Sequence, residues 1–222
     1  MDFGKLVGDS FEYAKEGLVG KWVTWILLII SCIIFPLIMG YIMRVYRGAG
    51  SAPELNEWGS MFIDGIKLFI VGLIYAIPII IIEVIVLGSA FLTGVMAQNY
   101  SQVNPDAILG LIGAVLFGVI ILAVVSIIIG LVLATAVVRF ARTNTFGEAF
   151  NFSAIFAHIG RIGMVSYILA LIVMIVIIGI VEVICMFIPY VGLLLLFILL
   201  PLLVVFEARY LTLLYDSAGT AA

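Results

Sequence analysis

Charged residues are scarce in this chain: only 10% of its 222 residues are Asp, Glu, Lys or Arg, whereas 66% are hydrophobic. A soluble domain carries about 25% charged residues, so a chain of this composition must be solvated by lipid. With one histidine, His158, and two cysteines inside apolar runs, Cys32 and Cys185, it offers neither a zinc cluster nor a disulfide framework. Its few basic residues are dispersed, which argues against a nucleic-acid partner. We therefore expect a membrane protein whose partner is the lipid bilayer, with no metal and no other cofactor.

Five apolar runs follow one another along the chain, and a helix of about 20 apolar residues is enough to cross a bilayer. They cover residues 22–43, 68–97, 107–138, 162–188 and 190–206, and the last helix is expected to continue to residue 208, so that it covers 190–208. Pro189, followed by Gly192, marks a tight turn between the last two runs, which we therefore expect to form a helical hairpin. The fold class that we predict is an all-α integral membrane protein, with a single membrane domain over residues 1–222.

Three amphipathic stretches accompany these runs and are expected to form helices in the membrane interface. The first covers residues 1–21, where apolar side chains recur at helical spacing among charged ones. The second and third, residues 51–67 and 145–161, each open with the Ser/Thr-x-x-Glu pattern of a capping box. We predict an interfacial helix over each stretch.

The Lys and Arg residues indicate the orientation, because the cytoplasmic segments of membrane proteins are enriched in them. They occur before residue 22, in segments 44–67 and 139–161 and at Arg209, and they are missing from residues 98–106 and from the Pro189 turn. If residues 22–43 enter the bilayer, turn at Pro36 and return to the same side, all basic residues are cytoplasmic. We favour this re-entrant hairpin plus four full spans, in the cell membrane with both termini cytoplasmic. A fifth span over residues 22–43 is the alternative.

A short internal repeat supports the re-entrant path. Residues 8–14, GDSFEYA, match residues 147–153, GEAFNFS, in residue class. Each copy is followed by Gly and a basic residue, and later by Cys-x-x-x-Pro, which ends at Pro36 in the first copy and at Pro189 in the second. The second copy has a full hairpin between these landmarks, whereas the first is shorter on each arm. The repeat therefore predicts a truncated first hairpin.

Three segments have a more specific pattern: GYIMRVYRG at residues 40–48, APELNEWGSMFIDGIK from Ala52, and LIYAIP at residues 73–78. Together they resemble a family of prokaryotic membrane proteins, common in archaea, that is known as domain of unknown function 4013. The resemblance covers nearly the whole chain, and its most specific part is Gly-Tyr-x-x-Arg-x-x-Arg with Trp58 and Gly65. It implies a multi-pass membrane protein and supplies no established activity.

Two carboxylates occur inside the apolar runs, Glu83 and Glu182. The helical rise places both in the outer half of the bilayer at comparable depth, where an acid must be protonated or find a partner. One interpretation is an ion- or proton-coupled polar site of Glu83, Glu182 and Tyr75, in which Pro78 frees a backbone carbonyl. The alternative is structural, with neutral acids that hydrogen-bond to hydroxyl groups across helices. The sequence leaves both interpretations open.

Other residues are candidates for contacts with lipid and with neighbouring helices. Arg44, Arg47 and Trp58 suit lipid headgroups, with ordinary interfacial anchoring as the alternative. Ser126, Gly130 and Ala134 follow one another at four-residue spacing, which lets helices pack closely, either within the chain or in a dimer.

The sequence contains no nucleophile elbow, phosphate loop or metal motif, and we expect no enzyme. The function that we predict is that of a membrane scaffold or accessory subunit, whose partner is a second copy or another membrane protein. The alternative is a small solute or ion transporter or channel that uses Glu83 and also Glu182.

Overall fold

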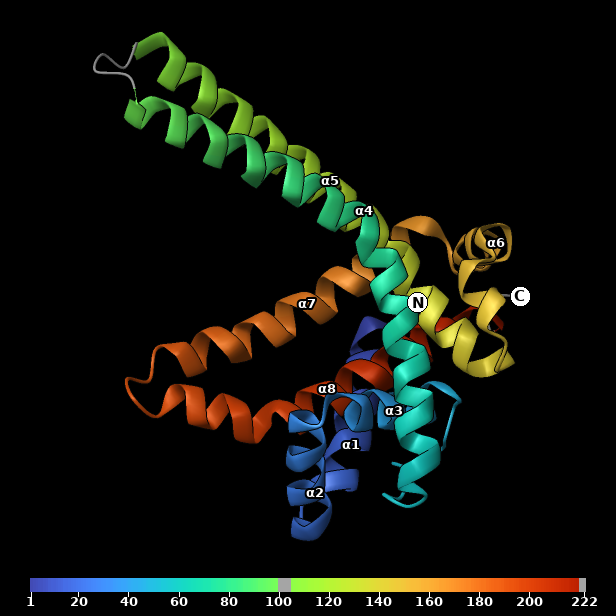
Figure 1. The fold of residues 1–222 in the computed structure, drawn as a ribbon. Helices are drawn as coiled ribbons and strands as arrows, with labels where there is room; N and C mark the ends of the chain where they lie inside the picture. Colours follow the sequence, from blue (N-terminus) through green and yellow to red (C-terminus); the bar gives the residue numbers. More distant parts are fainter. Residues whose placement is uncertain (100–104, 220–222) are drawn as a thin grey trace. The chain divides into compact units, whose positions relative to one another are not determined.

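The computed structural model describes residues 1–99 and 105–219, which form helices and contain no strand (Figure 1). In chain order the helices are α1 (Phe3–Leu18), α2 (Trp22–Ile33), α3 (Phe35–Tyr46), α4 (Trp58–Asn99), α5 (Pro105–Thr143), the 3-10 helix η1 (Phe146–Phe150), α6 (Phe152–Ile162), α7 (Met164–Met186), α8 (Gly192–Asp216) and the 3-10 helix η2 (Ser217–Gly219). The helices α4, α5, α7 and α8 are long and apolar enough to cross a membrane. The predicted fold class, an all-α multi-pass membrane protein, is confirmed.

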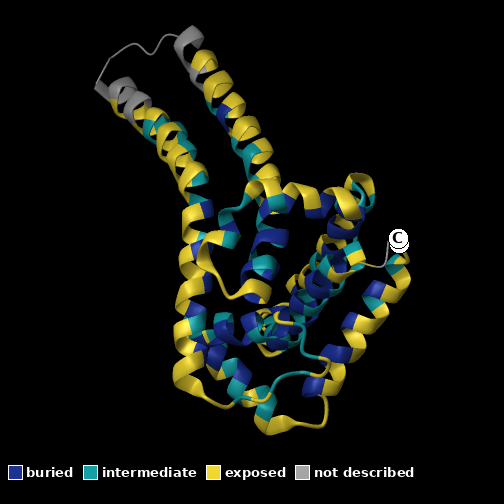
Figure 2. Ribbon diagram, turned by 90° about the vertical axis from the view of Figure 1, so that its right-hand side faces the viewer, coloured by how far each residue is buried: buried dark blue, intermediate teal, exposed yellow. Residues whose placement is uncertain are grey.

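The chain forms two compact units. Unit 1 comprises Met1–Val71 and Val132–Ala222, and unit 2 comprises Gly72–Leu131. The helices α4 and α5 each run through both units, and no change of composition marks the borders, so the sequence predicts one domain. Within unit 2 the two helices lie side by side as a hairpin (Figure 1). Most of this hairpin is exposed, whereas the buried residues belong mainly to unit 1 (Figure 2).

The helix α8 is the centre of unit 1, where it contacts α1, α2, α3 and α7. Hydrogen bonds from side chains to the backbone cross these contacts. Trp25 Nε1 of α2 donates to the Ile198 carbonyl of α8 (2.8 Å), and the Tyr210 hydroxyl of α8 donates to the Ala170 carbonyl of α7 (2.9 Å). The Tyr210 side chain is completely buried. The core of unit 1 therefore forms around the last long helix of the chain.

The apolar run over residues 22–43 is divided into two helices of 12 residues each, α2 and α3. The break falls at Ile34, whose backbone is not helical (φ −92°, ψ 78°), and Pro36 stands in the first turn of α3. A second bend precedes the run: α1 and α2 are inclined by 103° to one another. Because a helix of 12 residues is too short to cross a bilayer, neither α2 nor α3 spans by itself. The choice between a re-entrant hairpin and a fifth span stays a prediction.

The helix predicted over residues 51–67 differs from the structure. Residues 51–57 are not helical, and α4 begins at Trp58 and continues without interruption to Asn99. No helix follows the capping-box pattern at Ser51, because Arg44 binds the Glu54 carbonyl and the Asn56 side chain of this segment and Glu57 has a left-handed backbone (φ 50°). The predicted interfacial helix and the following span are therefore one helix of 42 residues.

The helix predicted over residues 145–161 is also divided, into η1 and α6. The Glu148 carboxylate, which a capping box would turn back to the Thr145 backbone, is bound by Arg139 instead. Asn151 takes over as the cap of α6, since its side-chain oxygen accepts from the Ala154 backbone N–H at 3.2 Å. A charged hydrogen bond is stronger than a neutral one, which explains why the ion pair prevails over the box.

Candidate functional site

The helix α3 and the first turns of α4 cross in unit 1 with their backbones in contact. A methyl group on Gly40 would lie 1.8 Å from the Met61 carbonyl oxygen, and one on Gly65 would lie 1.7 Å from the Pro36 carbonyl oxygen. No side chain fits at such distances, so glycine is required on both helices. The most specific part of the sequence motif, which contains Gly40 and Gly65, thus builds a close crossing of two backbones.

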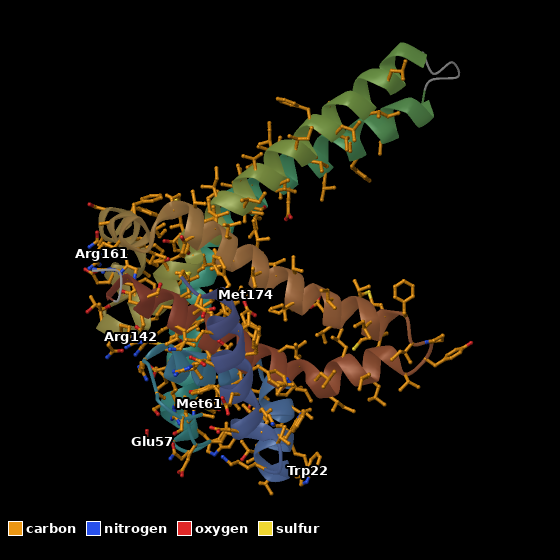
Figure 3. All side chains as sticks on the ribbon, turned by 180° about the vertical axis from the view of Figure 1, so that it is seen from behind. Trp22, Glu57, Met61, Arg142, Arg161 and Met174 are labelled. Atoms are coloured by element: carbon orange, nitrogen blue, oxygen red, sulfur yellow. The ribbon has the colours of Figure 1, made fainter. Side chains whose placement is uncertain are left out.

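Arg44 holds the segment that precedes α4. Its guanidinium donates to the Glu54 carbonyl oxygen (3.0 Å), to Asn56 Oδ1 (2.9 Å) and to Ser60 Oγ (3.3 Å). The carboxylate of Glu57, which directly precedes α4 and is labelled in Figure 3, lies 3.8 Å from the same guanidinium. Arg44 is therefore bound to groups of the chain itself, and its side chain is only 14% exposed.

Arg47, one helical turn further along, connects α3 with α4 and with the end of α5. It forms an ion pair with Asp64 of α4 (2.7 Å) and donates to Asn144 Oδ1 (3.4 Å). Asp64 is 14% exposed and also pairs with Lys67 at 3.4 Å. The two arginines of the motif thus bind the loop before α4 and the second turn of α4, respectively.

Arg142, near the end of α5 (labelled in Figure 3), joins the same region from the other side. Its Nη2 lies 2.7 Å and 2.8 Å from the two carboxylate oxygens of Asp216 at the end of α8. Its guanidinium packs against Gly48, where a methyl group would lie 2.6 Å from the Arg142 Cζ atom. Gly48 has a φ of +89°, which glycine adopts without strain. The ends of α3, α5 and α8 meet here.

We refer to Arg47, Gly48, Asp64, Arg142, Asn144 and Asp216 as the charged junction. All six residues belong to unit 1. Two arginines face two aspartates, so the charges balance, and the direct ion pairs leave little of this charge for a ligand. In the part of the chain that the structure describes, no group of three His, Cys, Asp or Glu side chains could hold a metal ion. The chemistry of the junction is that of fixing helix ends.

Arg139 and Arg209 extend this pattern around the charged junction. Arg139 Nε donates to the Glu148 carboxylate at 2.7 Å, and this hydrogen bond holds the pKa of Glu148 below its usual range. Arg209 Nη1 donates to the Ala49 carbonyl (3.0 Å), and its guanidinium lies 4.5 Å from the centre of the Tyr13 ring. With Arg161, whose guanidinium bonds to His158, each of the six arginines of the chain has a partner within it.

Sequence reasoning missed Asp64, Arg139, Arg142 and Asp216. One signal was available for the arginines, because Arg139 and Arg142 repeat the three-residue spacing of Arg44 and Arg47 at the end of an apolar run. The aspartates gave no such signal, since the arginines that bind them, Arg47 for Asp64 and Arg142 for Asp216, lie elsewhere in the sequence. Of the predicted headgroup contacts, Arg44 and Arg47 are bound within the chain, and Trp58 is 38% exposed at the first position of α4.

The predicted polar site is distributed over both units. Glu83, Tyr75 and Pro78 lie on α4 in unit 2, where Glu83 and Pro78 are exposed and Tyr75 is 6% exposed. Glu182 is exposed on α7 in unit 1, and another carboxylate, that of Glu207, lies on the neighbouring helix α8. Glu207 is a third carboxylate inside an apolar helix that the sequence analysis overlooked. Glu207 lies near other charged residues at the C-terminal end of α8, so the sequence does not distinguish it from an ordinary surface acid.

The small residues of α5 divide into two kinds. A methyl group on Gly118 would lie 2.5 Å from a Val86 methyl group, so this glycine packs on α4 within unit 2. A methyl group on Gly130 would meet nothing within 4 Å, and Ser126 and Ala134 are half-buried. Of the predicted stripe of Ser126, Gly130 and Ala134, the central residue faces open space.

The fold and the charged junction define a multi-pass helical membrane protein with interlocked helix ends. Residues 24–190, more than half of the chain, match the model of the family described as "Protein of unknown function (DUF4013)". The chain belongs to this family, which confirms the resemblance found in the sequence. No curated protein and no solved structure matches the chain.

Proposed function

We propose that this protein is a membrane scaffold or accessory subunit, which binds other membrane proteins or further copies of itself and has no enzymatic activity. The supporting observation is that each of the six arginines is bound to groups of the chain itself. Bound in this way, the arginines fix the ends of α3, α5 and α8 and give unit 1 a defined surface, which assembly requires. An enzyme that acts on phospholipid would need some of these cations free for its substrate.

A small solute or ion transporter or channel is the second candidate, and Glu83 is the observation that favours it. This carboxylate is exposed on a span, and among the described residues it forms no hydrogen bond or ion pair. An acid at such a position requires a partner, a proton or an ion. Pro78, one turn before it, frees a backbone carbonyl that could assist in binding.

We also propose that the protein lies in the cell membrane with both termini on the cytoplasmic side, since the Lys and Arg residues follow that distribution. In a background with Cys32→Ser and Cys185→Ser, we expect an impermeant thiol reagent to label Ser101→Cys and not Glu12→Cys in intact cells. Glu12 is exposed on α1, so only the side of the membrane would protect a cysteine there. Labelling of both positions would contradict this orientation.

Reconstitution separates the scaffold from the transporter. Wild-type protein and the Glu83→Gln variant are purified in mild detergent, weighed by native mass spectrometry and placed in vesicles that enclose a pH-sensitive dye. For a scaffold we expect both proteins to form a defined assembly heavier than the 24.1 kDa chain, with no proton flux that depends on Glu83. A flux that is present in the wild type and lost in Glu83→Gln would establish the transporter. A monomer of 24.1 kDa in both cases would contradict the scaffold.

A further inference from the structure

His158, the single histidine of the chain, connects α6 with the C-terminal end of α8 in unit 1. Its side chain is buried, with 6% exposed, and its ring stacks on the Tyr215 ring at 3.7 Å with 17° between the planes. His158 Nε2 lies 2.9 Å from the Tyr215 carbonyl oxygen, and Nδ1 lies 3.0 Å from Arg161 Nη2. One ring nitrogen therefore faces a hydrogen-bond acceptor, and the other faces a hydrogen-bond donor.

These two partners determine the protonation state of the ring. A guanidinium can only donate a hydrogen bond, so Nδ1 must accept from Arg161. A carbonyl oxygen can only accept, so Nε2 must carry the proton that it donates to Tyr215. The arrangement requires a neutral imidazole. A second proton on Nδ1 would remove the acceptor and bring an N–H group against the Arg161 guanidinium.

The charges around His158 act in the same direction. Arg161 lies on α6, Arg139 on α5 and Asp216 on α8, and the Asp216 carboxylate is already paired with Arg142. Burial lowers the pKa of His158, and the charges of Arg161 and Arg139 lower it further, whereas the Tyr215 hydrogen bond and Asp216 oppose them. Two cations and burial thus favour the neutral ring.

We propose that His158 is a pH-responsive latch, which holds α6 on the C-terminal end of α8 when its ring is neutral and releases α6 when the ring is protonated. The folded protein binds a proton at His158 less readily than the unfolded chain does. The latch is therefore fully closed above the ordinary histidine pKa of about 6.5, and its stabilisation is lost as the pH falls through the lower pKa of the folded state. Acidification opens it.

Release of α6 would change a neighbouring cavity. A cavity of 440 Å³ lies between α1, α6 and the end of α8, and its lining includes Ile162, the last residue of α6, together with Leu6, Asp216 and Ser217. Ile162 lies one helical turn after His158 on α6, and Asp216 is the residue after Tyr215 on α8, so both sides of the latch contribute to the wall of this cavity. Protonation of one buried ring would thereby open a mixed polar and apolar surface on unit 1, whatever the function of the protein.

Cysteine reactivity tests the latch in the full-length protein. In a background with Cys32→Ser and Cys185→Ser, Ile159→Cys reports the buried side of α6 (2% exposed) and Ser153→Cys serves as an exposed reference on the same helix. The ratio of their labelling rates removes the intrinsic pH dependence of thiols. We expect this ratio to rise severalfold from pH 7.5 to pH 5.5, and to stay constant when His158→Gln is added, because glutamine can donate to Tyr215 and does not titrate. A ratio that is constant with His158 present, or that rises equally with His158→Gln, would overturn the proposal.

Hydrogen exchange of the wild-type protein gives a second test, which does not depend on whether any variant folds. After correction for the intrinsic pH dependence of exchange, we expect acidification to speed exchange in α6 and in the last turn of α8 relative to α7. Equal acceleration in α7 would show general loosening and would contradict a local latch.

Discussion

The two units of this protein hold their helices together by different means. In unit 1, backbones touch at Gly40 and Gly65, and ion pairs with defined geometry fix the helix ends. In unit 2, α4 and α5 meet through apolar side chains, of which Val86 against Gly118 is an example. Backbone contacts and ion pairs tolerate little displacement, whereas helices that meet only through apolar side chains can shift slightly against one another. We therefore expect unit 1 to depend on individual residues and unit 2 to tolerate substitution, and three sets of variants test this difference.

The largest effect is expected for Gly65→Ala. Because the new methyl group would lie 1.7 Å from the Pro36 carbonyl oxygen, α3 and α4 must move apart, and the contacts of Arg44 and Arg47 are weakened with them. Overpacking against a backbone that cannot yield costs about 3 kcal/mol of unfolding free energy or more. The measurement is unfolding of the purified protein in mixed micelles. Gly59→Ala on the same helix is the control, since a methyl group there meets nothing within 4 Å. Equal stability of the two variants would refute the close crossing.

An intermediate effect is expected for Asp64→Asn, which removes the charge that Arg47 and Lys67 share. Asp64 is 14% exposed and Arg47 is 36% exposed, so the pair is worth more than a surface salt bridge, and we expect a loss of about 1–2 kcal/mol. Asp216→Asn serves as the comparison, because its pair with Arg142 is more exposed (48% and 31%) and should lose less than about 1 kcal/mol. The loss from Asp216→Asn should also shrink in concentrated salt. A reversed order of the two losses would show that burial does not govern the charged junction.

The smallest effect is expected in unit 2, for Gly118→Ala. Its methyl group would lie 2.5 Å and 3.0 Å from the two methyl groups of Val86. Because a valine in a helix keeps one χ1 rotamer, α4 and α5 must separate slightly to make room. The helical preference for alanine over glycine, about 0.5–1 kcal/mol, offsets part of the overpacking cost, so we expect a net loss of about 1 kcal/mol or less. Gly130→Ala, which meets open space, should gain that preference in full. If Gly118→Ala proved as damaging as Gly65→Ala, the contrast between the units would fail.

Composition and periodicity were sufficient to predict the class of fold and the apolar helices, and the resemblance of three segments to a known family indicated the family. They could not predict where helices begin near charged side chains. The capping-box patterns at Ser51 and Thr145 are local signals, and in both places an arginine from elsewhere in the chain binds a group of the pattern. Arg44 binds the carbonyl of Glu54, and Arg139 binds the carboxylate of Glu148. Such competition becomes visible only when the distant partner is in place.

The candidate site was predictable to a smaller extent. Gly40, Arg44, Arg47 and Gly65 were singled out as a motif, but their role in a helix crossing was not foreseen. Asp216 and Arg142 are separated by 74 residues, and no periodicity connects them. One partner of His158, Arg161, lies three residues away on α6, but the other, Tyr215, comes from the end of α8. The sequence therefore did not indicate that His158 connects the two helices.

The contacts of α3 also bear on the order in which the chain assembles during synthesis. Arg44 and Ser60 are 16 residues apart in sequence, whereas Trp25 of α2 reaches a carbonyl 173 residues further on. A chain is made from its N-terminus, so α3 and the start of α4 can join while most of the protein does not yet exist. The indole N–H of Trp25 cannot form its hydrogen bond until α8 has been translated. The core of unit 1 is therefore completed only when the last long helix has been made.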